Sequence, residues 1–201
     1  MLTNNEFDLV FDCQKIFKGV MNAMANPGKI FNINSQCEKL VINDKVPAAI
    51  AMTLMDNRSR LYVEGNEELY ALIREKTLAV KSNAEDADFI ITTDIENMVE
   101  YNLHLLDCAK VGTLSEPHKS AMLLVEIKEF AGKDKLVFEG PGIENSREVN
   151  LPEAAAMWLR KRNEKNYEFP CGIDILFYTN NGEIMGIPRT LKVGGERIWD
   201  M

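Results

Sequence analysis

The sequence predicts an α/β fold in which a mixed β-sheet is flanked by helices on its faces. Three observations favour this class. Helical and strand patterns largely alternate from residue 7 to residue 106, as they do in βα units. An antiparallel pair of strands is then expected within residues 121–139, and a β-hairpin within residues 173–187 closes the sheet.

The first half of the chain supplies the alternating elements. Thr3-Asn4-Asn5-Glu6 fits a capping box, and apolar residues at helical spacing then predict a long helix that ends at Asn26-Pro27-Gly28. Apolar and β-branched patterns place the remaining elements of this half. Helices are expected at 48–55, 67–76 and 94–106, strands at 30–33, 60–64 and 87–92, and a turn at 56–59.

The second half changes character. Strands at 121–130 and 136–139 flank Gly132-Lys133-Asp134, and this predicts that they pair in antiparallel fashion. Gly140-Pro141-Gly142 is expected to be a turn, because it lacks the lysine and hydroxyl residue of a phosphate-binding loop. Leu151-Pro152-Glu153 opens a helix that runs to about residue 163, and Gly194-Gly195 is expected to be a flexible exit.

The closing hairpin carries the most specific local prediction. Asn181-Gly182 suits the two positive-φ positions of a type I′ turn, so residues whose numbers sum to 363 would lie opposite each other. Both faces of the hairpin are apolar, which indicates a strand pair covered on both sides. We expect Ile173, Ile175 and Phe177 on one face, and Leu176, Tyr178, Met185 and Ile187 on the other.

Two charged residues interrupt this apolar hairpin. The predicted register places Asp174 directly opposite Arg189. One interpretation is an ordinary cross-strand ion pair at the margin of the sheet. The other is an arginine that a carboxylate orients toward a phosphate or a partner subunit. The local pattern leaves both open.

Composition limits the function classes. The net charge of −8 argues against a nucleic-acid-binding or anionic-membrane-binding protein, although a few local cations would suffice for a small anion. No apolar run approaches 18 residues, and the acidic start of the chain does not resemble a signal peptide, so we expect a cytoplasmic protein. The four cysteines are far apart and are expected to be free thiols.

Four short motifs resemble one known family, the H subunit of bacterial carbon–phosphorus lyase (PhnH). They occur in order from about residue 7 to residue 193, although Cys171 stands where the family often has an aliphatic residue and residues 93–112 carry no clear match. The matches are Phe17, Met24, Ala25, Pro27 and Gly28; Thr53, Leu54, Asp56 and Asn57; Gly140, Gly142 and Ile143; and Phe169, Pro170, Gly172, Ile173 and Asp174 with Pro188, Arg189 and Thr190.

The resemblance implies a fold and a function. It implies one domain over residues 1–201, similar to a reduced large domain of pyridoxal-phosphate-dependent transferases and without the cofactor. It implies a subunit that works with the G, I and J subunits, and with the ATP-binding L subunit, in the step that forms α-D-ribose 1-methylphosphonate 5-triphosphate from ATP and an alkylphosphonate. It also implies a homodimer when the subunit is isolated. It does not identify a chemical role for this subunit, which is expected to be inactive alone.

The candidate site residues are few. Asp174, Arg189 and Thr190 come from the closing motifs as contacts for a ligand or a partner. His118 and Lys119 lie in the polar loop at 115–120, which combines a base, two hydroxyl groups and a cation. No catalytic residue is identified. His104 and Cys108 have the spacing of two ligands on one helical face, but no second pair completes a metal site, so none is expected.

Two other hypotheses remain beside the lyase subunit. A stand-alone pyridoxal-phosphate enzyme would need a buried lysine for the Schiff base, and Lys81 and Lys110 each follow a short apolar run. A non-catalytic module or scaffold subunit would bind a nucleotide or a phosphonate without turning it over.

Overall fold

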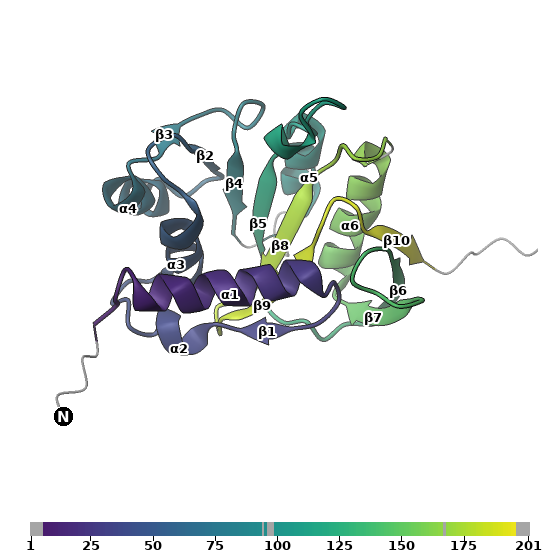
Figure 1. The fold of residues 1–201 in the computed structure, drawn as a ribbon, viewed down its shortest axis with the longest axis horizontal. Helices are drawn as coiled ribbons and strands as arrows, with labels where there is room; N and C mark the ends of the chain where they lie inside the picture. The colour runs from purple at the N-terminus through teal and green to yellow at the C-terminus, as the bar shows by residue number, and fades with distance from the viewer. Residues whose placement is uncertain (1–5, 94, 96–98, 167, 196–201) are drawn as a thin grey trace, which may run out of the picture.

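The computed structural model describes residues 6–93, 95, 99–166 and 168–195, and these form two β-sheets with helices around them (Figure 1). The predicted mixed sheet is confirmed as a seven-stranded sheet with the order β1-β9-β8-β5-β4-β2-β3. Neighbouring strands from β8 to β3 are parallel, whereas β9 pairs antiparallel with both β8 and β1. The strands are β1 (Phe31–Asn32), β2 (Arg60–Val63), β3 (Val80–Lys81), β4 (Phe89–Thr92), β5 (Met122–Glu126), β8 (Asp174–Tyr178) and β9 (Glu183–Ile187).

Helices cover both faces of this sheet. Successive apolar residues of the central strands point to opposite faces, so Ile91, Leu124 and Leu176 belong to one core while Ile90, Leu123 and Ile175 belong to the other. The first core is completed by α1 (Phe11–Ala25), α3 (Lys45–Leu54) and α4 (Glu67–Thr77), with the short α2 (Asn34–Cys37) beside them. The second core is completed by α5 (Val99–Cys108), α6 (Glu153–Lys165) and the second sheet.

The second sheet corrects the prediction for residues 121–139. β5 does not pair with its successor; it lies between β4 and β8 in parallel register, because both of its faces are buried. The next strand, β6 (Asp134–Glu139), forms a separate antiparallel sheet with β7 (Arg147–Leu151) and β10 (Lys192–Gly195). At Gly132 a Cβ atom would lie 1.9 Å from the backbone of Leu151, so the chain passes closely beneath β7 there instead of turning into a hairpin.

Two more predictions of the second half are settled by this sheet. Gly194-Gly195 is not a flexible exit, since both residues pair with β6. Gly140-Pro141-Gly142 does form the expected turn, in which the amide of Ile143 donates to the carbonyl of Gly140.

The helices that the sequence predicts lie close to their expected ranges, whereas the short α2 was not predicted. α1 ends at Ala25 as expected, but it begins at Phe11, where the side chain of Asp8 accepts hydrogen bonds from the amides of Val10 and Phe11. The predicted capping box is Thr3-Asn4-Asn5-Glu6, and all of it except Glu6 lies outside the described residues. In the part of the chain described here, no helix combines the length and apolarity needed to cross a membrane.

The closing hairpin is confirmed, but its predicted register is wrong by one residue. Its loop has three residues, Asn180, Asn181 and Gly182, and Thr179 pairs with Glu183 across it. Gly182 takes the positive φ (73°) at the third loop position, which is the geometry of a type I turn followed by a bulge. Asn-Gly therefore indicates the hairpin correctly without fixing its loop length.

The corrected register moves side chains to other faces. Ile175 pairs with Ile187 and Phe177 with Met185, so Ile187 and Met185 share a face with them instead of lying opposite. Both faces are covered within the chain, as the apolar pattern indicated. Continuing the register by one residue places Pro188, and not Arg189, across from Asp174.

One buried cation connects helix α6 to both sheets. Arg162 is 0% exposed, and its guanidinium donates to three backbone carbonyls. Nε donates to Ile173 O at 2.9 Å, Nη1 to Leu191 O at 3.3 Å and Nη2 to Pro188 O at 2.5 Å. These carbonyls lie just before β8 and between β9 and β10, so a single side chain fixes the path from the large sheet to the small one.

We expect Arg162→Met to lower the free energy of unfolding by roughly 3–5 kcal/mol, because three buried carbonyls lose their donor at once. The measurement is urea unfolding followed by circular dichroism. Arg160→Met on the same helix is the matched control. Arg160 is 53% exposed and forms a surface ion pair with Asp134, so its loss should cost about 0–1 kcal/mol. Equal losses in the two variants would contradict the bridging role of Arg162.

Candidate functional site

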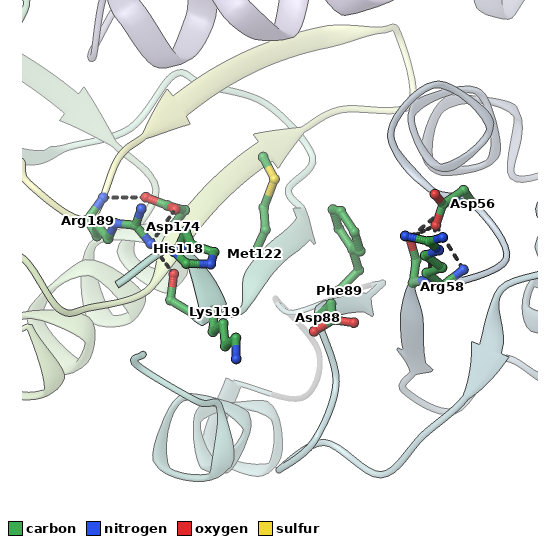
Figure 2. Close-up of a pocket in the computed structure, with 11 residues that line it drawn as sticks. Asp56, Arg58, Asp88, Phe89, His118, Lys119, Met122, Asp174 and Arg189 are labelled. Carbon is green, nitrogen blue, oxygen red and sulfur yellow. Dashed lines mark hydrogen bonds and ion pairs between the residues drawn. The ribbon is translucent and has the colours of Figure 1, made fainter. Parts of the chain in front are cut away.

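A surface pocket lies at the amino ends of the parallel strands (Figure 2). The first residues of β4, β5 and β8 are lateral neighbours, since Phe89 pairs with Met122 and Met122 with Asp174. The cavity measures about 450 Å³. It is lined by Asp56, Arg58, Ser59, Asp88, Phe89, His118, Lys119, Ser120, Met122, Asp174 and Arg189.

The pocket lies at the edge of the sheet opposite to the one where ligands usually bind. Open parallel sheets commonly bind ligands outside the carboxyl ends of their strands. Here the antiparallel strand β9 returns the chain to the amino ends, and Arg189 lies two residues after its last residue, Ile187. The loop that contains the 3-10 helix Pro117–Lys119 leads into β5 at the same edge. The topology therefore brings residues that are far apart in sequence to one place.

Arg189 and Asp174 form one wall of the pocket. The backbone amide of Arg189 donates to Asp174 Oδ1 at 2.6 Å, and Arg189 Nη1 lies 3.7 Å from Asp174 Oδ2. The same Nη1 donates to Pro117 O and to Ser120 Oγ. Both side chains are about four-fifths buried, with 23% and 21% exposed. The expected contact between the two residues is thus present, although it is made in the segment that follows β9 and not as a cross-strand pair.

Helix α6 holds this wall from behind. Asn166 Oδ1 accepts a hydrogen bond from Ile173 N at 2.7 Å, and Asn166 Nδ2 donates to Arg189 O at 3.2 Å. Arg162 binds the carbonyls of Ile173 and Pro188, which precede Asp174 and Arg189 respectively. The backbone on both sides of the Asp174–Arg189 contact is therefore fixed by hydrogen bonds from one helix.

Burial shifts the pKa values of Asp174 and Arg162, and the two groups differ in how well their charged forms are stabilised. Burial raises the pKa of Asp174 above its ordinary value, and the hydrogen bond from Arg189 N and the positive charges of Arg189 and Arg162 oppose this rise only in part. Burial lowers the pKa of Arg162 to about 10, against the attraction of Asp174. Arg162 therefore keeps its charge at neutral pH, and the wall holds two arginines beside one carboxylate.

Two further carboxylates line the pocket, Asp56 at the opposite wall and Asp88 next to Phe89 (Figure 2), and both have local partners. Asp56 Oδ1 accepts from the amides of Arg58 (2.9 Å) and Ser59 (3.1 Å), and the hydrogen bond from Arg58 N is the largest cause of a lowered pKa of Asp56. Asp88 binds Lys110 Nζ and the amide of Arg60. Burial raises the pKa of Asp88, but these partners outweigh it and leave the pKa lowered.

The floor between the two walls is apolar. Phe89 and Met122 are partly buried and pack against the core beneath α1, α3 and α4. Figure 2 shows their side chains standing between the group around Asp174 and the group around Arg58. The pocket thus combines an apolar floor with charged side chains at both ends.

The structure brings together four of the five residues that the sequence indicated. His118, Lys119, Asp174 and Arg189 line the same pocket, whereas Thr190 does not. The carbonyl oxygen of Thr190 faces Gly140, where a Cβ atom would lie 3.2 Å away. Lys119 is exposed and pairs with Glu116 at 2.8 Å.

Sequence reasoning missed the remaining lining residues. Asp56, Arg58 and Ser59 were expected only to form a turn, and Phe89 and Met122 only to be strand residues. The one available signal was that Asp56 falls in the family motif with Thr53 and Leu54. Among the residues described, no three His, Cys, Asp or Glu side chains gather closely enough to hold a metal ion.

Comparison with known proteins gives a consistent result. A family model described as "Bacterial phosphonate metabolism protein (PhnH)" matches residues 6–194. A protein of Stutzerimonas stutzeri named "Putative C-P lyase subunit protein HtxG" is 23% identical over 182 residues, which cover 90% of this chain and 85% of that protein. The "Alpha-D-ribose 1-methylphosphonate 5-triphosphate synthase subunit PhnH" of Rhizobium meliloti (strain 1021) is 26% identical over 197 residues, which cover 94% of each chain.

The raised pKa of Asp174 predicts the direction in which pH changes the stability of the protein. A carboxyl group with a higher pKa in the folded state binds its proton more tightly there, so its contribution to the unfolding free energy increases as pH falls through that pKa. We expect Asp174→Asn to remove this component, so that the stability difference between wild type and variant varies with pH in the acid range. Thermal unfolding across the acid range, together with ¹³C carboxyl NMR, measures both quantities. A titration of Asp174 below that of an unstructured aspartate would contradict the assignment.

Proposed function

The chain belongs to the PhnH family of bacterial phosphonate metabolism proteins, and from that premise we propose that it is a subunit of a carbon–phosphorus lyase complex. The observation that carries this proposal is the family match, which extends over residues 6–194 and so includes both sheets and the pocket. The names of the two relatives agree with it.

We propose further that the subunit is required in the step that forms α-D-ribose 1-methylphosphonate 5-triphosphate from ATP and an alkylphosphonate. The name of the Rhizobium meliloti relative supports this step. The proposed partners are the G, I and J subunits, and the proposed location is the cytoplasm. The chain acts as one domain whose fold is similar to that of a reduced pyridoxal-phosphate transferase domain.

The second candidate function is a subunit that binds a nucleotide or a phosphonate, or that acts as a scaffold, without catalysis. The pocket favours binding, because the planar guanidinium groups of its two arginines can anchor an anion. The reaction would then take place on residues of the partner subunits.

A stand-alone pyridoxal-phosphate enzyme receives little support from the lysines that would serve it. Lys81 is 59% exposed and binds both carboxylate oxygens of Glu67 at 2.9 Å. Lys110 is paired with Asp88. A Schiff-base lysine needs an uncharged amine, whereas carboxylate partners favour the charged ammonium form.

Co-expression with the G, I and J subunits tests the proposed function. We expect the chain to co-elute with them in size-exclusion chromatography, and we expect deletion of its gene to abolish growth on methylphosphonate. Arg189→Lys keeps the charge but loses the planar fork, so it should weaken assembly or growth while the isolated chain still folds. Arg160→Lys is the matched control on an exposed site. Independent elution under all conditions would contradict the proposal, and normal growth with lowered thermal stability would make Arg189 a structural ion-pair partner.

We propose that the isolated chain is a homodimer, but through another surface than the hairpin. The apolar faces of the hairpin are not free for such a contact, because both are buried within the chain. Large exposed apolar side chains instead gather at α1, where Phe11 is 65% exposed and Phe17 and Met21 are 50% exposed. Figure 1 shows α1 on the outside of the fold. Clusters of this kind commonly mark protein–protein contacts.

We expect a dimer at micromolar concentration in analytical ultracentrifugation, and we expect Phe17→Glu to shift it toward monomer by placing charges in the contact. Val41→Glu is the control, since Val41 is 98% exposed and lies outside α1. A monomeric wild type would refute the dimer, and a Phe17→Glu variant that stays dimeric would place the contact elsewhere.

A further inference from the structure

We propose that the pocket at the amino ends of the parallel strands binds a small molecule that carries a tetrahedral oxyanion beside a flat apolar group. The inference deepens the proposed function and rests on it for the view that this pocket meets a small molecule. A cavity of about 450 Å³ is within the range of small-molecule sites, roughly 300–1,000 Å³. Its polar and apolar halves have separate structural origins.

The oxyanion half is centred on Arg189. One nitrogen, Nη1, is committed to Pro117 O, Ser120 Oγ and the nearby Asp174 carboxylate. The Nε and Nη2 atoms donate to no atom among the described residues. These two form one edge of the planar guanidinium, the edge that binds two oxygens of a phosphate or phosphonate in parallel. The guanidinium is thus fixed by one corner and leaves a bidentate edge unoccupied.

The surroundings of Arg189 are rigid, as a binding anchor requires. Its amide is bound by Asp174 and its carbonyl by Asn166 at 3.2 Å. The buried Arg162 binds the carbonyl of the preceding residue, Pro188. An arginine that is already ordered loses little conformational entropy when it meets an anion.

Cations at the rim add to the attraction. Lys119 pairs with Glu116, but the two side chains are 60% and 47% exposed, and an exposed pair of this kind contributes little and is easily exchanged for a ligand. Arg58 is exposed at the opposite wall, where its charge also helps to lower the pKa of the neighbouring Asp56. The pocket carboxylates, in contrast, each have local donors: Asp56 the amides of its turn, Asp88 a lysine and Asp174 an arginine.

The apolar half consists of Phe89 and Met122. The two residues are paired on adjacent parallel strands, so their side chains stand side by side on the same face of the sheet. An aromatic ring next to a polarisable thioether is a suitable surface for a flat ligand group. Since this floor lies between the walls, a ligand on it can reach Arg189 with an attached oxyanion (Figure 2).

Phenylphosphonate is the simplest probe that carries both groups. Titration into the isolated ¹⁵N-labelled chain, followed by NMR, should give shifts at the pocket residues. We expect it to bind about tenfold more tightly than methylphosphonate, which lacks the ring, or benzyl alcohol, which lacks the oxyanion, since about 1.4 kcal/mol of added contact corresponds to tenfold.

Three variants separate the halves of the site. Arg189→Met should weaken phenylphosphonate and methylphosphonate alike by about tenfold or more, because a charge-assisted bidentate contact is lost. Phe89→Ala should remove only the advantage of phenylphosphonate over methylphosphonate. Arg58→Ala changes an exposed side chain, so it tests the electrostatic attraction with little effect on stability. It should weaken the binding of both phosphonates several-fold. Arg160→Met is the control and should bind both probes as the wild type does.

The inference is overturned if phenylphosphonate binds no more tightly than methylphosphonate, or if Arg189→Met binds as the wild type does. It is also overturned if millimolar probe produces no shifts at the pocket while Arg189→Lys still disrupts co-elution with the partner subunits. That last result would make the pocket a partner contact and leave the proposed function standing. Binding without co-elution would support the inference and contradict the proposed function.

Discussion

The fold depends on the burial of one guanidinium group. Arg162 has no exposed surface, yet burial leaves its pKa at about 10 and so does not discharge it at neutral pH. A buried charge is costly unless it is hydrogen-bonded, and each of the three guanidinium nitrogens donates to a carbonyl, the three carbonyls coming from two chain segments. The segments that lead into β8 and out of β9 therefore have to approach α6, and the chain between them has to form the hairpin. The position of the small sheet follows, because β10 begins one residue after Leu191.

Burial on both faces determines the order of the large sheet. β4, β5 and β8 each supply apolar residues to both cores, so none of them can lie at an edge. The edges are occupied by two-residue strands, β1 and β3, which expose little unpaired backbone. Since β9 runs antiparallel to β8, the segment after it ends at the amino ends of the parallel strands. The pocket is therefore a consequence of topology, and the residues that line it come from five separate parts of the chain.

The sequence predicted those features that are set by neighbouring residues. Periodicity located the long helices and the buried strands, because each element carries its own apolar pattern. Periodicity gave wrong predictions where contacts between distant segments determine the structure. β5 pairs with β4 and β8 because both of its faces are buried. Its closeness in sequence to residues 136–139 therefore predicts the wrong pairing partner. The loop length of the hairpin depends on which residue takes positive φ, and Asn-Gly permits either choice.

The candidate site was half predictable for the same reason. Arg189, Asp174, His118 and Lys119 stand out locally, as charges in apolar strands or as a polar loop. Arg162 and Asn166 do not stand out, because polar residues on a helix are ordinarily exposed, and only the folded chain shows that they hold Asp174 and Arg189 in place. Phe89 and Met122 have the sequence pattern of ordinary strand residues. Their place at the open end of the strand is visible only once the sheet is assembled.

The choice of arginine at both positions has a common physical cause. Three carbonyls that lie on separate segments can each be met by a different nitrogen of one planar guanidinium, whereas an ammonium group would have to reach all three from one atom. The same geometry lets Arg189 bind the protein through Nη1 and keep another edge available. The Asp174 carboxylate is attracted by both arginines, and its raised pKa shows that their charges do not fully offset the cost of its burial. One negative charge beside two positive ones leaves this wall positive in a chain of net charge −8. A wall of this charge would attract an anion even though the protein as a whole is acidic.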